Sequence, residues 1–286
     1  MRQPQPLLTL LLLLCCPWAR ASALRAQIVG GHEAQPHSHP YMAYLKIAGL
    51  GACGGFLVAP DWPGGSFPGA ILEQVPPVLG NSLNQSAKMR EVGDTQLDFP
   101  FLPSSAMARN ITVILGAHNI QEPEKTQQVR GVLKYHEHPE YNPDTMENDI
   151  MLLQASSSLT SKVTLNDYIQ PIPLPKSGRD LPTGTKCMIA GWGLIDEDRA
   201  TNKLFETKVS IYSRRKCVLF YPHLDSGMIC AGSFHELKDS SQGDSGGPLV
   251  CNKVAQGIVS FGYNSPPGVY TRISNYLRWI KKVMKK

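Results

Sequence analysis

Short runs of β-branched and apolar residues, separated by turn residues, recur along this chain and restrict its fold more than any other feature. Such runs lie at Tyr41–Ile47, Thr112–Leu115, Asp149–Leu153, Met188–Trp192 and Gly257–Gly262. Twenty-five glycines and 23 prolines among the 286 residues supply turns between them. This pattern predicts an all-β protein of many short antiparallel strands, arranged in barrels or a sandwich.

Only the C-terminal segment has clear helical periodicity. Its apolar residues recur at helix spacing and so share one face: Ile273, Tyr276, Leu277, Ile280 and Met284. The basic residues that follow suit the negative end of a helix dipole: Arg278, Lys281, Lys282, Lys285 and Lys286. A run of this kind predicts a solvated helix face, or alternatively a site for a heparin-like glycosaminoglycan or an acidic surface.

The first 23 residues have the features of a signal peptide. Arg2 gives a positive start, Leu7–Leu14 an apolar stretch, and Ala21-Ser22-Ala23 a cleavage site of small residues. The apolar stretch is too short to span a bilayer, and no later segment is apolar enough. We therefore expect an exported chain without a membrane span. Beyond residue 27, 25 basic and 23 acidic residues remain, so the charge gives no reason to expect a nucleic-acid partner.

The strongest chemical signal is the hexapeptide Gly243-Asp244-Ser245-Gly246-Gly247-Pro248. A serine nucleophile needs an exposed hydroxyl on a tight turn, with backbone N–H groups nearby to hold an oxyanion. Glycines around the serine permit that turn and a close approach of substrate. The hexapeptide therefore makes Ser245 the candidate nucleophile.

Further motifs accompany the hexapeptide: Ile28-Val29-Gly30-Gly31, Asn148-Asp149-Ile150 and Ala190-Gly191-Trp192-Gly193. Together they resemble the chymotrypsin-like serine proteases, from Ile28 to the C-terminus. Phrases such as Pro40-Tyr41-Met42-Ala43 and Trp279-Ile280-Lys281-Lys282 are most similar to the granzyme, mast-cell chymase and cathepsin G branch. The resemblance implies two packed antiparallel six-stranded β-barrels with a C-terminal helix. It also implies a secreted or granule-stored monomeric endopeptidase for protein or peptide substrates, without metal or cofactor.

The resemblance also assigns roles to residues of the site. Ser245 matches the nucleophile, the N–H groups of Gly243 and Ser245 match the oxyanion hole, and Asp149 matches the carboxylate that orients the histidine base. Residues 24–27 match a short activation peptide that precedes a protease domain at 28–286. Its removal would give Ile28 a free ammonium group that pairs with Asp244, a switch rather than a source of stability.

The residue six places before the nucleophile forms the floor of the primary specificity pocket in this family, and here it is Asp239. A buried carboxylate there favours substrate Arg or Lys through charge-assisted hydrogen bonds. Ser260, Gly262 and Gly268 match the walls of that pocket. The alternative is that Asp239 is a solvent-facing acid on a loop.

Five cysteines follow the leader, an odd number. Cys187–Cys251 and Cys217–Cys230 match two family disulfides. Cys53 matches a cysteine whose partner directly follows the catalytic histidine in an Ala-Ala-His-Cys motif. This chain has no such motif, so Cys53 is the odd cysteine.

The resemblance breaks across 63–108, where six prolines and five glycines lie among weakly patterned residues. We expect an atypical, disordered insert that replaces a strand-and-loop unit and disrupts the first barrel. The base is lost with that unit, and none of the other histidines lies between Cys53 and Asn110, where the base belongs: His32, His37, His39, His118, His136, His138, His223 and His235. The chain as written is therefore expected to be inactive or severely impaired.

Two explanations for the insert remain open. It is either a wrongly joined exon or splice variant of an active protease, or part of a real inactive homologue that acts as a glycosaminoglycan- or surface-binding protein. Asn84-Gln85-Ser86, within the insert, and Asn110-Ile111-Thr112 are candidate glycosylation sites.

Overall fold

The computed structural model of the protein describes residues 31–48, 51–59, 70–73, 111–155, 163–196, 199–232, 244–262 and 266–285. Its strands are β1 (His32–Glu33), β2 (Met42–Ile47), β3 (Gly51–Ala59), β4 (Ala70–Glu73), β5 (Ile111–Leu115), β6 (Gln128–Glu137), β7 (Met151–Ala155), β8 (Lys186–Gly191), β9 (Leu194–Asp196), β10 (Arg199–Ala200), β11 (Phe205–Ile211), β12 (Met228–Gly232), β13 (Pro248–Cys251), β14 (Val254–Phe261) and β15 (Gly268–Arg272). Its helices are α3 (Arg214–Cys217) and α4 (Ile273–Met284).

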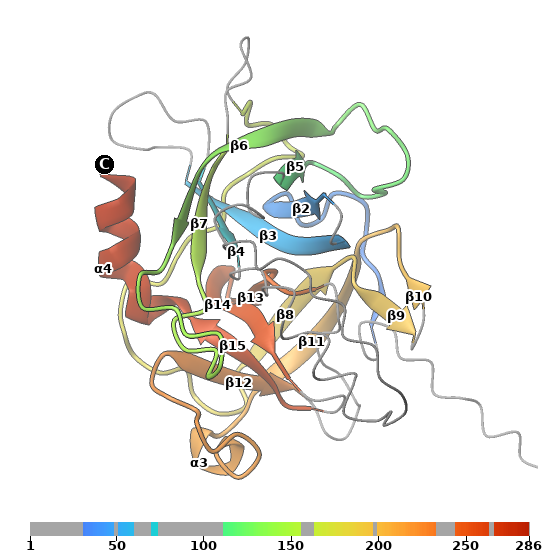
Figure 1. Ribbon diagram of the computed structural model, residues 1–286. Coiled ribbons are helices and arrows are strands. Elements are labelled where there is room, and N and C mark those ends of the chain that lie inside the picture. Colours follow the sequence, from blue (N-terminus) through green and yellow to red (C-terminus); the bar gives the residue numbers. More distant parts are fainter. Residues whose placement is uncertain are drawn as a thin grey trace, which may run out of the picture.

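The first half of the chain forms a closed barrel in the order β2-β3-β4-β7-β6-β5 (Figure 1). Along β5 the side chains alternate between buried and half-buried, because successive residues of a strand point to opposite faces. The inward residues join one core that includes Leu45, Leu57, Val113, Leu115 and Leu153.

The expected disruption of this barrel is not observed. Ala70–Glu73, within the stretch assigned to the insert, form β4, which pairs with β3 on one side and with β7 on the other. Strand pairing uses backbone groups that every non-proline residue carries, so a segment of unrelated sequence is able to supply the sixth strand. The rest of 63–108 lies outside the described residues.

The second half forms a seven-stranded sheet in the order β1-β11-β12-β15-β14-β13-β8. Because β8 also pairs with β11, the six strands from β11 to β8 close on themselves. The two six-stranded units lie against each other in Figure 1. All five strand segments expected from the sequence overlap observed strands of these units.

Helix α4 buries the face that its periodicity predicts. Ile273, Tyr276 and Ile280 are buried, with Leu277 and Met284 partly buried, and they pack with Phe56 of the first barrel and Ile258 of the second. The helix therefore contributes to a core that both barrels share. None of the helices in the described residues has the length and apolar run needed to cross a membrane.

Both expected disulfides are present. Cys187–Cys251 links β8 to β13, with the two cysteines 64 residues apart, and Cys217–Cys230 links α3 to β12, with the cysteines 13 apart. Neither bond includes Cys53, which lies half-buried on β3. The short α3 is not predicted by the sequence pattern, because four residues make little more than one helical turn.

Candidate active site

Asp149 is fully buried two residues before β7. The Ser260 hydroxyl donates a hydrogen bond to its carboxylate, and the Thr271 hydroxyl donates to its backbone carbonyl at 2.7 Å. Ser260 lies where β14 shifts register against β15, between Val259 and Phe261, and such bulges often re-aim a side chain beside a site. Two strands of the second barrel thus fix a carboxylate that the first barrel carries.

Two tyrosines, the buried Tyr276 and the partly buried Tyr141, flank the Asp149 segment. The Tyr276 hydroxyl of α4 donates to Oδ1 of Asn148 at 3.2 Å. Burial raises the pKa of Tyr276, and the nearby carboxylates of Asp225 and Asp149 raise it further. Burial likewise raises the pKa of Tyr141, with Asp149 adding to the shift. Both tyrosines therefore remain neutral hydroxyl donors at physiological pH.

Ser245 lies on a tight turn whose backbone is held from both barrels. Its carbonyl accepts a hydrogen bond from the Gly54 N–H at 2.8 Å, and the Gly247 N–H donates to the Asp244 carbonyl at 2.9 Å. Gly246 has a φ of 86°, a conformation that glycine adopts without steric cost. Its N–H donates to the carbonyl of Val259 at 2.9 Å. Adjacent residues of β14, Val259 and Ser260, thus hold the Ser245 turn and Asp149.

Asp244 is buried against the Gly191-Trp192-Gly193 segment. Its Oδ1 accepts a hydrogen bond from the Gly193 N–H at 2.9 Å. A Cβ added to Gly191 would lie 2.2 Å from that oxygen, and one added to Gly193 would lie 2.6 Å from it. Glycine at both positions therefore makes the space that the carboxylate occupies.

Gly191→Ala is expected to destabilise the fold by about 1–3 kcal/mol, because overpacking forces buried groups apart. Urea denaturation of the variant measures the loss. Gly178→Ala is the matched control, since no atom lies within 4 Å of a Cβ added there, and it should leave the unfolding midpoint nearly unchanged. Equal midpoints for the two variants would contradict the close approach at Gly191.

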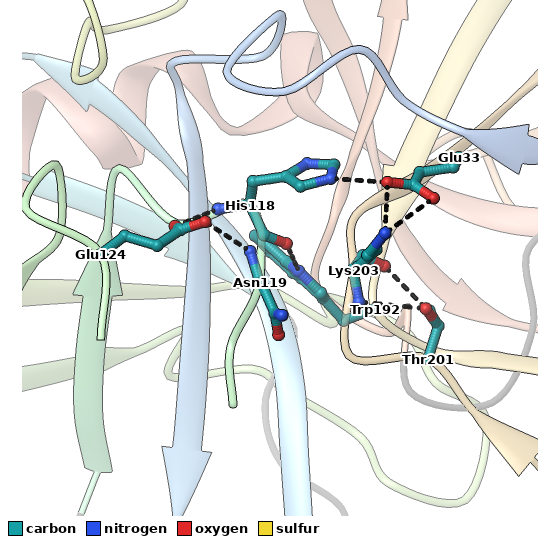
Figure 2. Close-up of polar contacts among 7 residues, drawn as sticks. All are labelled: Glu33, His118, Asn119, Glu124, Trp192, Thr201 and Lys203. Carbon is teal, nitrogen blue, oxygen red and sulfur yellow. Dashed lines mark hydrogen bonds and ion pairs between the residues drawn. The ribbon is translucent and has the colours of Figure 1, made fainter. Parts of the chain in front are cut away.

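Glu33 of β1 anchors the segment that follows the expected new N-terminus (Figure 2). Its Oε1 lies 3.1 Å from His118 Nε2 and 3.1 Å from Lys203 Nζ. The backbone N–H of His118 donates to Glu124 Oε2 at 2.7 Å, and its carbonyl accepts from Trp192 Nε1 at 3.0 Å. His118 thereby connects Glu33 to Trp192, in the segment that holds Asp244.

The hydrogen bonds from His118 and then Lys203 lower the pKa of Glu33 from its ordinary value of 4.5. Since the pKa is lower in the folded state, this contact stabilises the fold above pH 4.5, and its contribution is lost as the pH falls through the folded value. Glu33→Gln should therefore cost less than about 1 kcal/mol at neutral pH, as is usual for exposed pairs. Urea denaturation between pH 3 and pH 7 measures the effect, with Glu122→Gln as an exposed control; a deficit that persists unchanged at low pH would contradict it.

Other described histidines contact partners of their own. The ring of His39 bonds to the Glu206 carboxylate, and the Tyr41 hydroxyl lies 3.0 Å from its Nδ1. The ring of His138 packs edge-on against Tyr276, with the centroids 5.3 Å apart. These contacts stabilise the packing of both rings within the fold.

Two of the candidate pocket walls, Gly262 and Gly268, face each other. A Cβ added to Gly262 would lie 3.3 Å from the Gly268 Cα, so any side chain at position 262 would narrow this space. Gly262 follows Ser260 by two residues, and Ser260 bonds to Asp149. The walls and the buried carboxylate are thus parts of one region.

Several sequence-predicted sites lie outside the described residues: the leader 1–23, the activation peptide 24–27, Ile28, Asn84, Asn110, Asp239 and Gly243. Sequence reasoning missed Thr271 and Tyr276 as partners of the Asp149 segment. Threonine on a strand and tyrosine on an amphipathic helix carry no local signal of such a role. Gly191 and Gly193, which make space for Asp244, do have a local signal in the sequence, because the two glycines flank a large tryptophan.

The Trypsin family model matches residues 28–62 and 104–280. Cathepsin G of Homo sapiens is 40% identical over 98% of this chain and 95% of its own length. Granzyme B of Homo sapiens is 39% identical over 99% of both chains. The solved "Structure of GrC" matches with a TM-score of 0.70 and 34% identity, covering 90% of this chain and 99% of that one. The gap between these two matches falls within 63–108, the stretch predicted to be an atypical insert.

Proposed function

The chain belongs to the trypsin family of serine proteases, and from this premise we propose that it retains the family's nucleophile and buried carboxylate but catalyses no peptide hydrolysis. In the family the reaction passes through an acyl-enzyme on the serine. The roles proposed here are nucleophile for Ser245, oxyanion donors for the N–H groups of Gly243 and Ser245, and orienting carboxylate for Asp149.

A single observation carries the proposal: no residue between Cys53 and Asn110 is a histidine. A serine hydroxyl is a weak nucleophile until an adjacent base accepts its proton. Asp149 already accepts a hydrogen bond from Ser260, and a carboxylate in that position orients an imidazole rather than replacing it. Without the base, Ser245 keeps its proton at neutral pH.

We propose two further properties of the ancestral site. Asp239 on the pocket floor gives a preference for Arg or Lys before the scissile bond, supported by the absence of side chains at Gly262 and Gly268. Cleavage after Gln27 frees the Ile28 ammonium to pair with Asp244, supported by the burial of that carboxylate.

The protein is secreted or stored in granules, as its leader and the names of its relatives suggest.

The test is hydrolysis of Arg and Lys amide substrates by protein prepared with Ile28 at its N-terminus. The unaltered protein and its Ser245→Ala variant should release product at the same rate. A rate that depends on Ser245 would overturn the proposal. Because the prepared N-terminus is already free, a failure to turn over cannot be assigned to missing activation.

A second candidate function is binding to glycosaminoglycans. Arg278, Lys281 and Lys282 of α4 and Lys285 directly after it are all exposed, and their spacing places them on one face. A basic stripe of this kind attracts sulfated polysaccharides in a salt-dependent way. Retention on heparin at physiological salt, lost in Lys281→Glu/Lys282→Glu, would support this function; elution at low salt would contradict it.

The origin of residues 63–108 has its own test. Tryptic digestion of the endogenous protein should give peptides that end at Lys88 or Arg90, or one from Glu91 to Arg109, if this stretch is translated. Those peptides would support an inactive homologue. A peptide with Ala-Ala-His-Cys after Trp62 would instead assign the stretch to a faulty transcript of a working protease.

A further inference from the structure

The loop that directly follows α3 exposes three consecutive large apolar side chains. Val218, Leu219 and Phe220 are 36%, 80% and 42% exposed. Contiguous apolar exposure of this kind marks an interaction surface more often than scattered single residues do. We propose that segment 215–223, which comprises the end of α3 and this loop, is a membrane-contact site that inserts its apolar tip into bilayers containing anionic lipid.

The apolar side chains are held outward by the residues on either side of them. Cys217 and Tyr221 are buried in a small core with Met228 and Val269. Cys217 is tied to β12 by its disulfide, and the Tyr221 hydroxyl donates to the carbonyl of Pro267 at 2.8 Å. Because both flanking residues are anchored inward, the loop between them is held at the surface with Leu219 at its most exposed point.

The backbone of the tip is also suited to an apolar environment. The N–H groups of Val218, Leu219 and Phe220 donate to the carbonyls of Arg214, Lys216 and Cys217 at 3.0, 3.2 and 2.9 Å. A bilayer offers no water to backbone donors, so donors satisfied within the loop lower the cost of insertion. The loop therefore presents side chains to lipid without exposing these N–H groups.

Cations lie beside the apolar tip. Arg215 and Lys216 are exposed immediately before it, and the sequence between Ser213 and Leu224 contains no aspartate or glutamate. Arg214 is occupied elsewhere, since its guanidinium donates to the carbonyls of Asp225 and Met228. The exposed charges of Arg215 and Lys216 therefore match the negative surface of an anionic membrane, which adds to the contribution of the apolar area.

The size of the surface favours a membrane over a protein partner. A stable protein interface buries about 800 Å² on each partner, far more than three side chains on a loop present. A bilayer requires no complementary pocket, only a protruding tip. In Figure 1 the α3 segment stands at the edge of the molecule, away from the junction of the two barrels.

The test is sedimentation of the full-length secreted protein with phosphatidylcholine vesicles, with or without phosphatidylserine. Binding is expected with phosphatidylserine. The binding constant should fall at least about tenfold in Leu219→Ser/Phe220→Ser, because burial of one such side chain raises it by roughly one to two factors of ten. Leu133→Ser is the matched control, since Leu133 of β6 is 62% exposed and should not affect binding. Arg215→Glu/Lys216→Glu should abolish the dependence on phosphatidylserine.

The proposal would be overturned by no binding to either vesicle, by equal loss in the Leu133 control, or by binding that Leu219→Ser/Phe220→Ser leaves unchanged. Lys281→Glu/Lys282→Glu separates this site from the basic face of α4 and should retain vesicle binding. Loss of vesicle binding in that variant alone would assign the contact to α4 and contradict the loop. All the changed side chains are exposed, so thermal unfolding should stay the same across the set and exclude misfolding as the cause.

Discussion

Replacing residues 63–108 with a family segment that carries Ala-Ala-His-Cys is expected to raise kcat for Arg and Lys amide substrates by about a millionfold, the factor that loss of the triad histidine costs. The physical reason is that Asp149 and Ser245, the two catalytic residues that the structure describes, are already held in place. Ser260 and Thr271 hold Asp149, and the Ser245 turn is fixed by β14. The graft supplies the imidazole that accepts the serine proton, and a cysteine to pair with Cys53.

The controls for this graft separate the effect of the base from the effect of the new segment on the fold. The same graft with alanine in place of its histidine should fold equally well and remain inactive. Ser245→Ala in the active graft should abolish turnover. Hydrolysis rates and urea midpoints are measured on all three proteins with Ile28 at the N-terminus. A folded graft without activity would contradict the account, because a missing base would then not be the defect.

Loss of the Cys187–Cys251 disulfide is expected to destabilise the protein by about 4 kcal/mol, because the bond closes a loop of 64 residues and so restricts the unfolded chain. Both cysteines are buried beside Val209 and Leu249 in the core of the second barrel. Cys187→Ser/Cys251→Ser should therefore lower the unfolding temperature by roughly 10 °C, given the few degrees per kcal/mol of a domain this size. Differential scanning calorimetry and urea denaturation measure both quantities.

The remaining cysteines provide the matched comparisons. Cys217→Ser/Cys230→Ser opens a loop of only 13 residues and should cost less, about 3 kcal/mol in the same chain-entropy treatment. Cys53→Ser breaks no disulfide and should cost the least of the three. A Cys53 variant as unstable as the Cys187–Cys251 variant would contradict this ranking.

Local periodicity predicts the C-terminal helix and several strands, whereas the arrangement in two barrels was expected from the family resemblance. The apolar face of α4 predicted Ile273, Tyr276 and Ile280 as core residues, and all three are buried. Short runs between turns predicted strands, because a pleated strand repeats every two residues. The resemblance to a family supplied the pairing of the disulfides, which spacing alone does not determine.

The sequence failed where structure depends on contacts between distant residues. β4 was not expected, because Ala70–Glu73 lie among prolines and glycines, and only pairing with β3 and β7 gives them a strand partner. The Glu33–His118 contact joins residues 85 apart, and no local pattern connects them. The exposure of Leu219 was likewise invisible, since a loop residue's direction depends on the anchors at Cys217 and Tyr221.

The most direct test of the central claim is the reactivity of Ser245 toward a fluorophosphonate, which modifies serine nucleophiles that a base has activated. The reagent is incubated with protein that begins at Ile28, and peptide mass spectrometry then locates the modified residues. The account predicts that Ser245 remains unmodified, like the other serines of the chain. Stoichiometric modification at Ser245, absent from the Ser245→Ala variant, would contradict it by showing that another group activates the serine.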